Sequence, residues 1–518
     1  MKKTILSLGL AAVATGCGGG EGESQSNAQV KPTPAPVQQA LETGNALLVS
    51  DPNDFIRESR QVVEGHKKQS NTIKSAIAKN LSGLYWDPTH DAAILAPQYG
   101  FNDTILMTNK AMASGYKDQA LSIGVAGEKA HGQRYALLGS NPFRTAQRFP
   151  ESSNAAMTQW LSNLVTWLSG GTTSNVVIAQ MDQSYYFPDE QATRNWLKDN
   201  VSQELAFNEA NLCDGSKLLS CLQTNTPNLL ILSQHLQSGD TNQQVLDALA
   251  YAEQAQIPVL YLHWDGGLTE LGRDILEKFH VDYVGDNYWR KLGLVDWAPS
   301  SLMNFVPDSV AMQQALLSRF ESQNFNVDLS QCDDKSCPDT ANMESQFYAG
   351  ANSIRHRLKK LDEQKVDLFN QDGYQYEKLM VLLADHYRQT VVFPMDKQST
   401  QTTEFLKSYF ADYVQYNSRS VNPKQPNSPD VKRISATINM ESKRNFRSAG
   451  VYALPGETFT VTRNDSNEVT TKIVINSLRS GATHEFSKDG YTRPKMLTSF
   501  AYEVKPGETI TLTSPYGG

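Results

Sequence analysis

The sequence lacks the pattern of residues with which many metalloenzymes hold a catalytic zinc ion. That pattern, H-E-x-x-H, places two histidines four residues apart on a helix, with a glutamate beside the first of them. Of the nine histidines, only His484 is followed by a glutamate, and the residue four positions beyond it is Lys488. We therefore expect no catalytic residue, no metal ligand and no bound cofactor within these 518 residues.

An excess of positive charge is also missing. The chain has 55 Asp and Glu against 47 Lys and Arg, which gives a net charge of -8 at pH 7. Because nucleic-acid binding depends on cationic side chains that neutralise phosphates, we expect no nucleic-acid partner. Beyond the N-terminus, no stretch approaches the roughly 20 apolar residues that a membrane-spanning helix needs.

Cysteine is scarce, and the first of the five cysteines has a special position. Cys17 follows a positive start, Met1-Lys2-Lys3, and a short apolar run from Ile5 to Ala14, which together are typical of an export signal. The small residues before Cys17 resemble a bacterial lipobox. We therefore expect residues 1–17 to be a lipoprotein-type signal peptide with Cys17 as the lipidated residue, and ordinary signal cleavage is the alternative.

An exported protein anchored by two acyl chains stays firmly on a membrane. The residue after Cys17 is glycine rather than aspartate. In the lipoprotein families that Cys17 resembles, this favours the outer membrane. The expected location is therefore the outer membrane, the cell surface or the exterior, and a lipid membrane is one expected partner.

The other four cysteines form two close pairs, Cys213 with Cys221 and Cys332 with Cys337. Exported chains meet an oxidising compartment, so we expect two local disulfides, although four cysteines allow three connectivities. A zinc site is the alternative, and the absence of any C-x-x-C argues against it.

A chain of 518 residues is too long for one core, and composition divides it into successive segments. Residues 18–39 are rich in Gly, Glu, Ser and Pro and predict a flexible linker. The other predicted segments are a mostly helical region at 40–132, an α/β domain at 133–300, a helical region with a disulfide loop at 301–420, a linker at 421–432, and a β-rich segment at 433–518.

The α/β domain is predicted from four apolar runs that alternate with amphipathic ones. The runs at 135–139, 176–179, 229–232 and 259–262 are short and fully apolar, as buried parallel strands are. The segments 155–168, 192–201, 244–254 and 269–279 read as the helices between and after them. This alternation predicts a doubly wound parallel sheet, and the block looks like a class I glutamine amidotransferase or a flavodoxin.

An amidotransferase would place a cysteine at the turn after one of these strands, where an exposed side chain can attack. Here the strand at 259–262 runs into His263, Trp264 and Asp265, and no Ser lies in a G-x-S-x-G context. Ligands bind at the carboxyl ends of such strands. We expect His263 and Asp265, with Ser140, Asn141 and His235, either to line a ligand cleft or to belong to a scaffold without chemistry.

Between 309 and 417, four amphipathic stretches predict a helical bundle. The last segment differs, because it alternates apolar and polar residues between Pro-Gly or Gly turns, as antiparallel strands do. Its marked residues are the turn YALPGE from Tyr452 to Glu457, the pair Arg493-Pro494, the turn Pro506-Gly507-Glu508 and the terminal run SPYGG at 514–518.

Those residues resemble the β-rich entry of the enhancin-like zinc metallopeptidases (peptidase family sixty-like). Within that family they are similar to the immunomodulating metalloprotease (ImpA) type, which is related to the accessory colonisation factor mucinases. The resemblance implies a peptidase that cleaves mucins and other O-glycosylated proteins. It also implies that SPYGG is followed by the zinc domain, so zinc is expected only if such a domain exists downstream.

The resemblance assigns the β-segment a role in positioning glycoprotein substrate. Arg479, Arg493 and Tyr516 are the residues we expect to contact a glycan. The expected partners are a glycoprotein or mucin substrate and the catalytic domain that this sequence lacks.

Two functions follow from these observations. The first is the N-terminal portion of an exported O-glycoprotein-degrading metallopeptidase, truncated before its zinc site and inactive alone. The second is a complete non-catalytic surface lipoprotein that binds glycoprotein or glycan. A hydrolase centred on the α/β domain is disfavoured, because the turn after the strand at 259–262 carries no nucleophile.

Overall fold

The computed structural model describes most of the chain from residue 35 to residue 514. The described ranges are 35–323, 345–390, 403–418, 434–439, 447–475, 499 and 501–514, with gaps at 89–91, 113–115, 117–118, 172, 182–188, 264–266, 287–291, 307 and 455–456.

A seven-stranded sheet with the order β3-β5-β6-β10-β9-β7-β8 is the largest element of the fold. The last five strands in this order are parallel, and β5 and β3 extend the sheet in antiparallel fashion. The strands are β3 (Asn102–Thr108), β5 (Leu121–Glu128), β6 (Arg134–Leu138), β7 (Asn175–Ala179), β8 (Ala206–Phe207), β9 (Leu229–Leu232) and β10 (Val259–Leu262).

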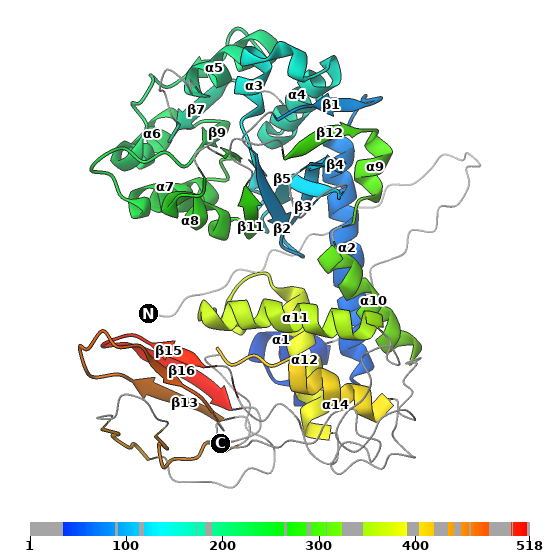
Figure 1. The fold of residues 1–518 in the computed structure, drawn as a ribbon, viewed down its shortest axis with the longest axis vertical. Coiled ribbons are helices and arrows are strands. Elements are labelled where there is room, and N and C mark those ends of the chain that lie inside the picture. Colours follow the sequence, from blue (N-terminus) through cyan, green and yellow to red (C-terminus); the bar gives the residue numbers. More distant parts are fainter. Residues whose placement is uncertain are drawn as a thin grey trace, which may run out of the picture. The chain divides into compact units, whose positions relative to one another are not determined.

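Helices cover both faces of this sheet (Figure 1). The first face packs against α3 (Pro142–Arg148), α4 (Ala155–Ser169) and α5 (Asp189–Asn200), and the second against α6 (Leu218–Asn225), α7 (Asn242–Gln254) and α8 (Glu270–Lys278). Along β9, Leu229 and Ile231 belong to the first core, and Leu230 and Leu232 belong to the second. A strand that is buried on both sides must be apolar throughout, which is why these runs were readable in the sequence.

The predicted strands and helices of the α/β domain are therefore present, but the sheet is mixed rather than parallel throughout. The helical prediction for residues 40–132 was wrong from 84 to 128, where β3 and β5 lie. Polar residues interrupt the apolar pattern of these strands. The hydroxyls of Thr104 on β3 and Ser122 on β5 satisfy each other inside the sheet, 3.0 Å apart.

Two smaller sheets adjoin the large one. One has the order β1-β12-β4, and the other pairs β11 with β2, all antiparallel. Their strands are β1 (Leu84–Trp86), β2 (Ala93–Pro97), β4 (Lys110–Ala111), β11 (Val281–Asp286) and β12 (Gly293–Trp297), and α9 (Pro299–Asn304) follows β12. Short 3-10 helices lie at Ala46–Leu48, Pro150–Ser152, Gly215–Lys217 and Leu368–Asn370.

Helix α2 (Asn53–Ile77) belongs to two hydrophobic cores. Phe55, Ile56 and Val63 pack into the core of the helical region, whereas Ile73 and Ile77 pack into the core on the first face of the sheet. One helix therefore joins elements that are hundreds of residues apart in the sequence.

The helical region contains the four helices that periodicity predicts, α10 (Asp308–Ser322), α11 (Ser345–Glu363), α12 (Gln375–Thr390) and α14 (Thr403–Tyr413), together with α1 (Ala35–Thr43). The predicted linker at 18–39 is wrong at its end, because α1 begins at Ala35 and Val37 is fully buried. Apolar contacts with the helical core overcome the proline-rich local composition there.

The C-terminal segment is β-structured and antiparallel, as predicted. Its strands are β13 (Glu457–Thr462), β14 (Thr471–Ile473), β15 (Tyr502–Val504) and β16 (Thr509–Ser514), with β13 paired to β16 and β14 to β15. A small core of Val504, Ile510, Leu512 and their neighbours holds the two pairs together. Lys365, just beyond α11, forms an ion pair with Glu508 in the turn before β16.

None of the helices in the described part of the chain is both long and apolar enough to cross a bilayer.

Candidate functional site

The carboxyl ends of β6 and β10 form the place where a ligand would be expected. These strands are neighbours in the sheet. The helices α3 and α4 after β6 cover the first face, and α8 after β10 covers the second. Adjacent parallel strands whose connections leave to opposite faces open a crevice at their carboxyl ends.

His263 lies directly after β10 and is only 4% exposed. Its backbone N–H donates to the carbonyl of Leu138 on β6 at 2.9 Å, so the strand pairing continues through it. Its Nδ1 lies 3.0 Å from the hydroxyl of Tyr261, and its Nε2 has no hydrogen-bond partner among the described residues. One nitrogen of the imidazole therefore has a hydrogen-bond partner among the described residues, and the other has none.

Burial lowers the pKa of His263 to about 4, and Asp286 opposes this shift only in part. The ring is therefore neutral at neutral pH. A neutral imidazole can donate one hydrogen bond and accept another, which suits a polar, uncharged ligand group.

Ser140 and Asn141 lie at the end of β6. A Cβ atom at the preceding Gly139 would lie 2.1 Å from the carbonyl oxygen of Ala93, so only glycine fits there. Asn141 caps α3, accepting from the N–H groups of Phe143 and Arg144 at 3.1 and 3.3 Å. It also donates to Asp189 at 2.9 Å. Asn141 is therefore a structural residue rather than a ligand group.

Ser140 differs from Asn141, because its buried Oγ has no partner within the described part of the chain. His235, which follows β9, is held through its backbone N–H, which donates to the carbonyl of Gln180 at 2.9 Å. The structure thus brings Ser140 and His263 to adjacent strand ends, and it places His235 beside the neighbouring strand β7 rather than with them.

The buried carboxylate of Asp214 supports the chain near His235. Asp214 accepts from the N–H of Gln180 at 2.7 Å and from the side-chain amide of Gln237 at 2.8 Å. Burial raises the pKa of Asp214, and these two hydrogen bonds oppose the shift. Because both oxygens have partners, we interpret Asp214 as a brace for the strand ends.

Among the described residues, no activated nucleophile lies at the carboxyl ends of β6 and β10. The two cysteines that the structure describes, Cys213 and Cys221, are joined in a disulfide, which is the predicted pairing. The other predicted site residues lie outside the described residues: Cys17, Asp265, Cys332, Cys337, Arg479, Arg493 and Tyr516.

A catalytic zinc does not fit the residues that the structure describes. They contain no group of three or more His, Cys, Asp or Glu side chains placed to hold a metal ion. We therefore derive no catalytic step through a metal.

Two family models match this chain, the immunomodulating metalloprotease N-terminal domain over residues 107–288 and the immunomodulating metalloprotease helical domain over residues 314–420. The chain belongs to the immunomodulating metalloprotease family. It fits the N-terminal part of such an enzyme. The matched ranges fall on the α/β domain and on the bundle of α10, α11, α12 and α14.

The immunomodulating metalloprotease of Pseudomonas aeruginosa is 24% identical over 507 residues, which cover 92% of this chain and 51% of the relative. Solved structures of the Pseudomonas aeruginosa enzyme IMPa, one with an O-glycopeptide and one with T-antigen, are similar in fold at a TM-score of 0.72. In both comparisons the identity is 22%, and the match covers 93% of this chain and 54% of the other. The chain thus spans about half the length of the immunomodulating metalloproteases it matches.

Tyr85 was not among the predicted site residues. The sequence marks Tyr85 and Trp86 as aromatics that could stack on a sugar, with local packing as the preferred interpretation. Packing is confirmed for Trp86, which is 2% exposed in the core. Tyr85 points the other way and lines a cavity with Asp296. The alternation of a strand would have placed the two aromatics on opposite faces, had residues 84–86 been predicted as a strand.

Proposed function

We propose that this protein acts on O-glycosylated proteins as a metallopeptidase of the immunomodulating metalloprotease type. The α/β, helical and β regions described here serve as its substrate-handling part. The observation that carries the proposal is the match to the Pseudomonas aeruginosa enzyme over 92% of this chain. The complex of IMPa with an O-glycopeptide supports the substrate class.

Peptide cleavage is assigned to a zinc domain outside the matched half. The 518 residues contain no H-E-x-x-H, and the described ones contain no metal-binding group. Recognition of the glycoprotein, rather than hydrolysis, is the task that this leaves for the regions described here.

Export and membrane anchoring belong to the same proposal. Cys17 is the residue that carries the lipid, and the protein is held at the outer membrane or the cell surface. The Cys213–Cys221 disulfide supports an oxidising compartment, because such bonds persist outside the cytosol.

The alternative is a glycoprotein-binding lipoprotein without any peptidase activity. The protein as its cells make it separates the two, because only a peptidase will cleave a mucin-domain substrate in a manner that a zinc chelator abolishes. Tight binding with no cleavage would establish the alternative.

Binding by the 518-residue chain tests the shared part of the proposal. A mucin-domain peptide with its O-glycans and the same peptide without them are immobilised side by side for surface plasmon resonance. We expect at least tenfold tighter binding to the glycosylated form. Equal affinity for both peptides would overturn glycoprotein recognition by this chain.

A further inference from the structure

Helix α2 crosses from the helical region to the α/β domain, and a glycine lies near its middle. Val63 packs into the core of the helical region and Ile73 into the core on the first face of the sheet, whereas residues 65–69 are exposed or half-buried. A Cβ atom at Gly65 would meet no described atom within 4 Å. Packing therefore does not require a glycine there, and because glycine weakens a helix relative to alanine, Gly65 gives α2 a soft point between its two cores.

The chain crosses between the same two parts a second time, between α9 and α10. Leu302 on α9 belongs to the core on the first face of the sheet, and Leu316 on α10 belongs to the core of the helical region. Lys74 on α2 donates to the carbonyl of Phe305 in this connection, at 3.4 Å. The two crossings therefore lie side by side, and two adjacent connections let the parts that they join rotate about one line.

Three aromatic rings also join the α/β domain to the helical region. Phe101, in the turn between β2 and β3, stacks on His280, in the turn between α8 and β11, with ring centroids 3.8 Å apart. Tyr374, just before α12, packs edge-on against both rings, at 4.8 Å from Phe101 and 5.5 Å from His280. Its hydroxyl lies 3.4 Å from Nδ1 of His280. We call these three residues the aromatic clasp.

The backbone of the clasp has an unusual conformation in both parts. His280 and Tyr374 have φ angles of +55° and +53°, in the left-handed region. Non-glycine residues are strained there, above all those with a bulky side chain, and such residues gather at switches and ligand clamps. The rings of the clasp are thus held together against a local backbone strain, which favours a contact that can be released.

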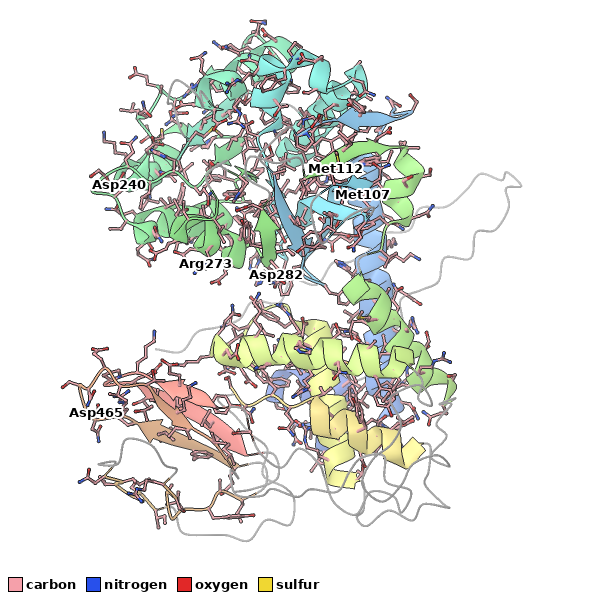
Figure 2. The ribbon with its side chains drawn as sticks, viewed as in Figure 1. Met107, Met112, Asp240, Arg273, Asp282 and Asp465 are labelled. Atoms are coloured by element: carbon pink, nitrogen blue, oxygen red, sulfur yellow. A yellow bond between two sulfur atoms is a disulfide. The ribbon has the colours of Figure 1, made fainter. Side chains whose placement is uncertain are left out.

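Polar contacts lie beside the clasp. Arg357 on α11 donates to Gln98, which follows β2, at 2.7 Å and to Glu377 on α12 at 3.2 Å. Gln98 donates to Asp282 on β11 at 2.9 Å, and Lys360 on α11 forms an ion pair with the same carboxylate; Asp282 is labelled in Figure 2. Because these groups are polar, water can replace their contacts when the two parts separate.

The charges around His280 are mostly positive. Besides the phenol of Tyr374, the groups that face it are Arg357 on α11, Lys129 between β5 and β6, Lys278 on α8 and Glu253 on α7. Burial, followed by the cations, lowers the pKa of His280 to about 4, and only Glu253 opposes this shift. A proton on the ring is therefore unfavourable while the clasp is closed and becomes favourable once water reaches the ring.

We propose that the α/β domain and the helical region form a hinged pair that opens in acid, with α2 bending near Gly65 and the aromatic clasp separating when His280 takes up a proton. This hinge does not depend on the proposed function. The open state binds the proton more tightly, so its share rises as the pH falls from 6.5 toward 4. With a pKa of about 4 when closed and 6.5 when open, His280 raises the open-to-closed ratio about 30-fold between pH 7.5 and pH 5.

Double electron–electron resonance on the 518-residue chain tests the hinge by measuring a distance between the two parts. Spin labels are attached through a ketone amino acid, which leaves the native cysteines unlabelled. They replace Arg273 on α8 and Gln364 after α11, which are both exposed; Arg273 is labelled in Figure 2. We expect a second, longer distance whose share relative to the first is at least tenfold higher at pH 5 than at pH 7.5.

Two variants separate the trigger from the hinge. His280→Asn tolerates the left-handed backbone but does not titrate, so its ratio should be the same at both pH values, whereas His356→Asn, exposed on α11, is the control and should keep the wild-type response. Gly65→Ala places a methyl group in open space and stiffens α2, so it should lower the ratio at pH 5 at least threefold. Its control is Ser75→Ala, exposed on the same helix, which should leave the ratio unchanged.

Circular dichroism at both pH values shows that each variant is folded. A single distance in the wild type at both pH values overturns the hinge. A longer distance that still gains in acid in His280→Asn overturns His280 as the trigger, and a wild-type ratio in Gly65→Ala overturns the bend at Gly65.

Discussion

The ammonium nitrogen of Lys74 lies 2.9 Å from the carboxylate Oδ2 of Asp103, although Lys74 is only 2% exposed. Lys74 lies near the end of α2, and Asp103 lies on β3. Ser70, one turn earlier on α2, donates to the same carboxylate oxygen. A buried charge is tolerated only when it is paired, so this contact fixes α2 to the edge of the sheet.

Replacing Lys74 by methionine keeps most of the side-chain volume but leaves Asp103 without its cation. We expect the free energy of unfolding to fall by about 3 kcal/mol, as is typical when one partner of a buried pair is removed. Urea denaturation followed by circular dichroism measures the loss. The exposed Lys68→Met on the same helix is the control and should change stability by less than about 0.5 kcal/mol.

The double variant Lys74→Met/Asp103→Leu tests the cause. If the loss comes from an unpaired charge, removing both charges should recover part of it. A double variant that is as unstable as the sum of the two single variants would contradict the pairing.

The disulfide between Cys213 and Cys221 ties the segment before α6 to the first turn of that helix and closes a short loop. Replacing both cysteines by serine should lower the free energy of unfolding by about 2–3 kcal/mol, because the unfolded chain regains the freedom that the closed loop removes. Thermal unfolding of the oxidised proteins gives the comparison. Peptide mapping without reductant should first recover the linked 213–221 fragment from the wild type, and two separate peptides would show that the bond does not form.

Strands that are buried on both faces could be predicted from the sequence. The run Leu229–Leu232 is apolar at every position, and its predicted and observed limits agree. The same holds for Val259–Leu262. Such runs have no polar residue that would suit a helix surface or a loop, so pattern and structure coincide.

The edge strands could not be predicted from the sequence, because they contain polar groups whose hydrogen-bond partners lie far away in the sequence. Asn102 on β3 donates to the carbonyls of Phe279 and His280, each at 2.9 Å, far along the sequence. The cavity at Tyr85 was missed for a similar reason. Its second side chain, Asp296, comes from a strand more than two hundred residues later.

The burial of His263 predicts that the free energy of unfolding depends on pH. Its pKa is about 4 in the folded protein because of burial, against 6.5 for an ordinary histidine. Between these values the unfolded chain binds the proton and the native state does not, so stability falls as the pH drops from 6.5 toward 4. The loss from His263 amounts to about 3 kcal/mol.

His263→Gln cannot be protonated and should lose this dependence. The quantity to measure is the difference in unfolding free energy between wild type and variant at pH 7 and at pH 4.5, since all other titrating groups contribute equally to both proteins. We expect the difference to move in favour of the variant by about 2–3 kcal/mol at the lower pH. A difference that is constant with pH would show that His263 is not a buried neutral ring.

The buried Asp362, at the end of α11, predicts the opposite dependence on pH: the free energy of unfolding falls as the pH rises. It is 1% exposed at the end of α11, and its Oδ1 accepts from the N–H groups of Asn417 and Ser418 at 2.9 and 2.8 Å. Burial raises its pKa to about 6 from the ordinary 3.8, and the hydrogen bonds oppose the shift. The native state then holds the proton more tightly than the unfolded chain, so its contribution to stability is complete below pH 4 and is lost as the pH rises through 6.

Asp362→Asn keeps the shape and an acceptor oxygen but removes the ionisation. Relative to this variant, the wild type should lose roughly 3 kcal/mol between pH 4 and pH 7, measured by chemical denaturation at both values. Glu363→Gln, exposed at the next position, is the control and should show no such change. If the wild type keeps a constant margin over Asp362→Asn, then the hydrogen bonds from Asn417 and Ser418 hold Asp362 ionised throughout and outweigh the cost of burial.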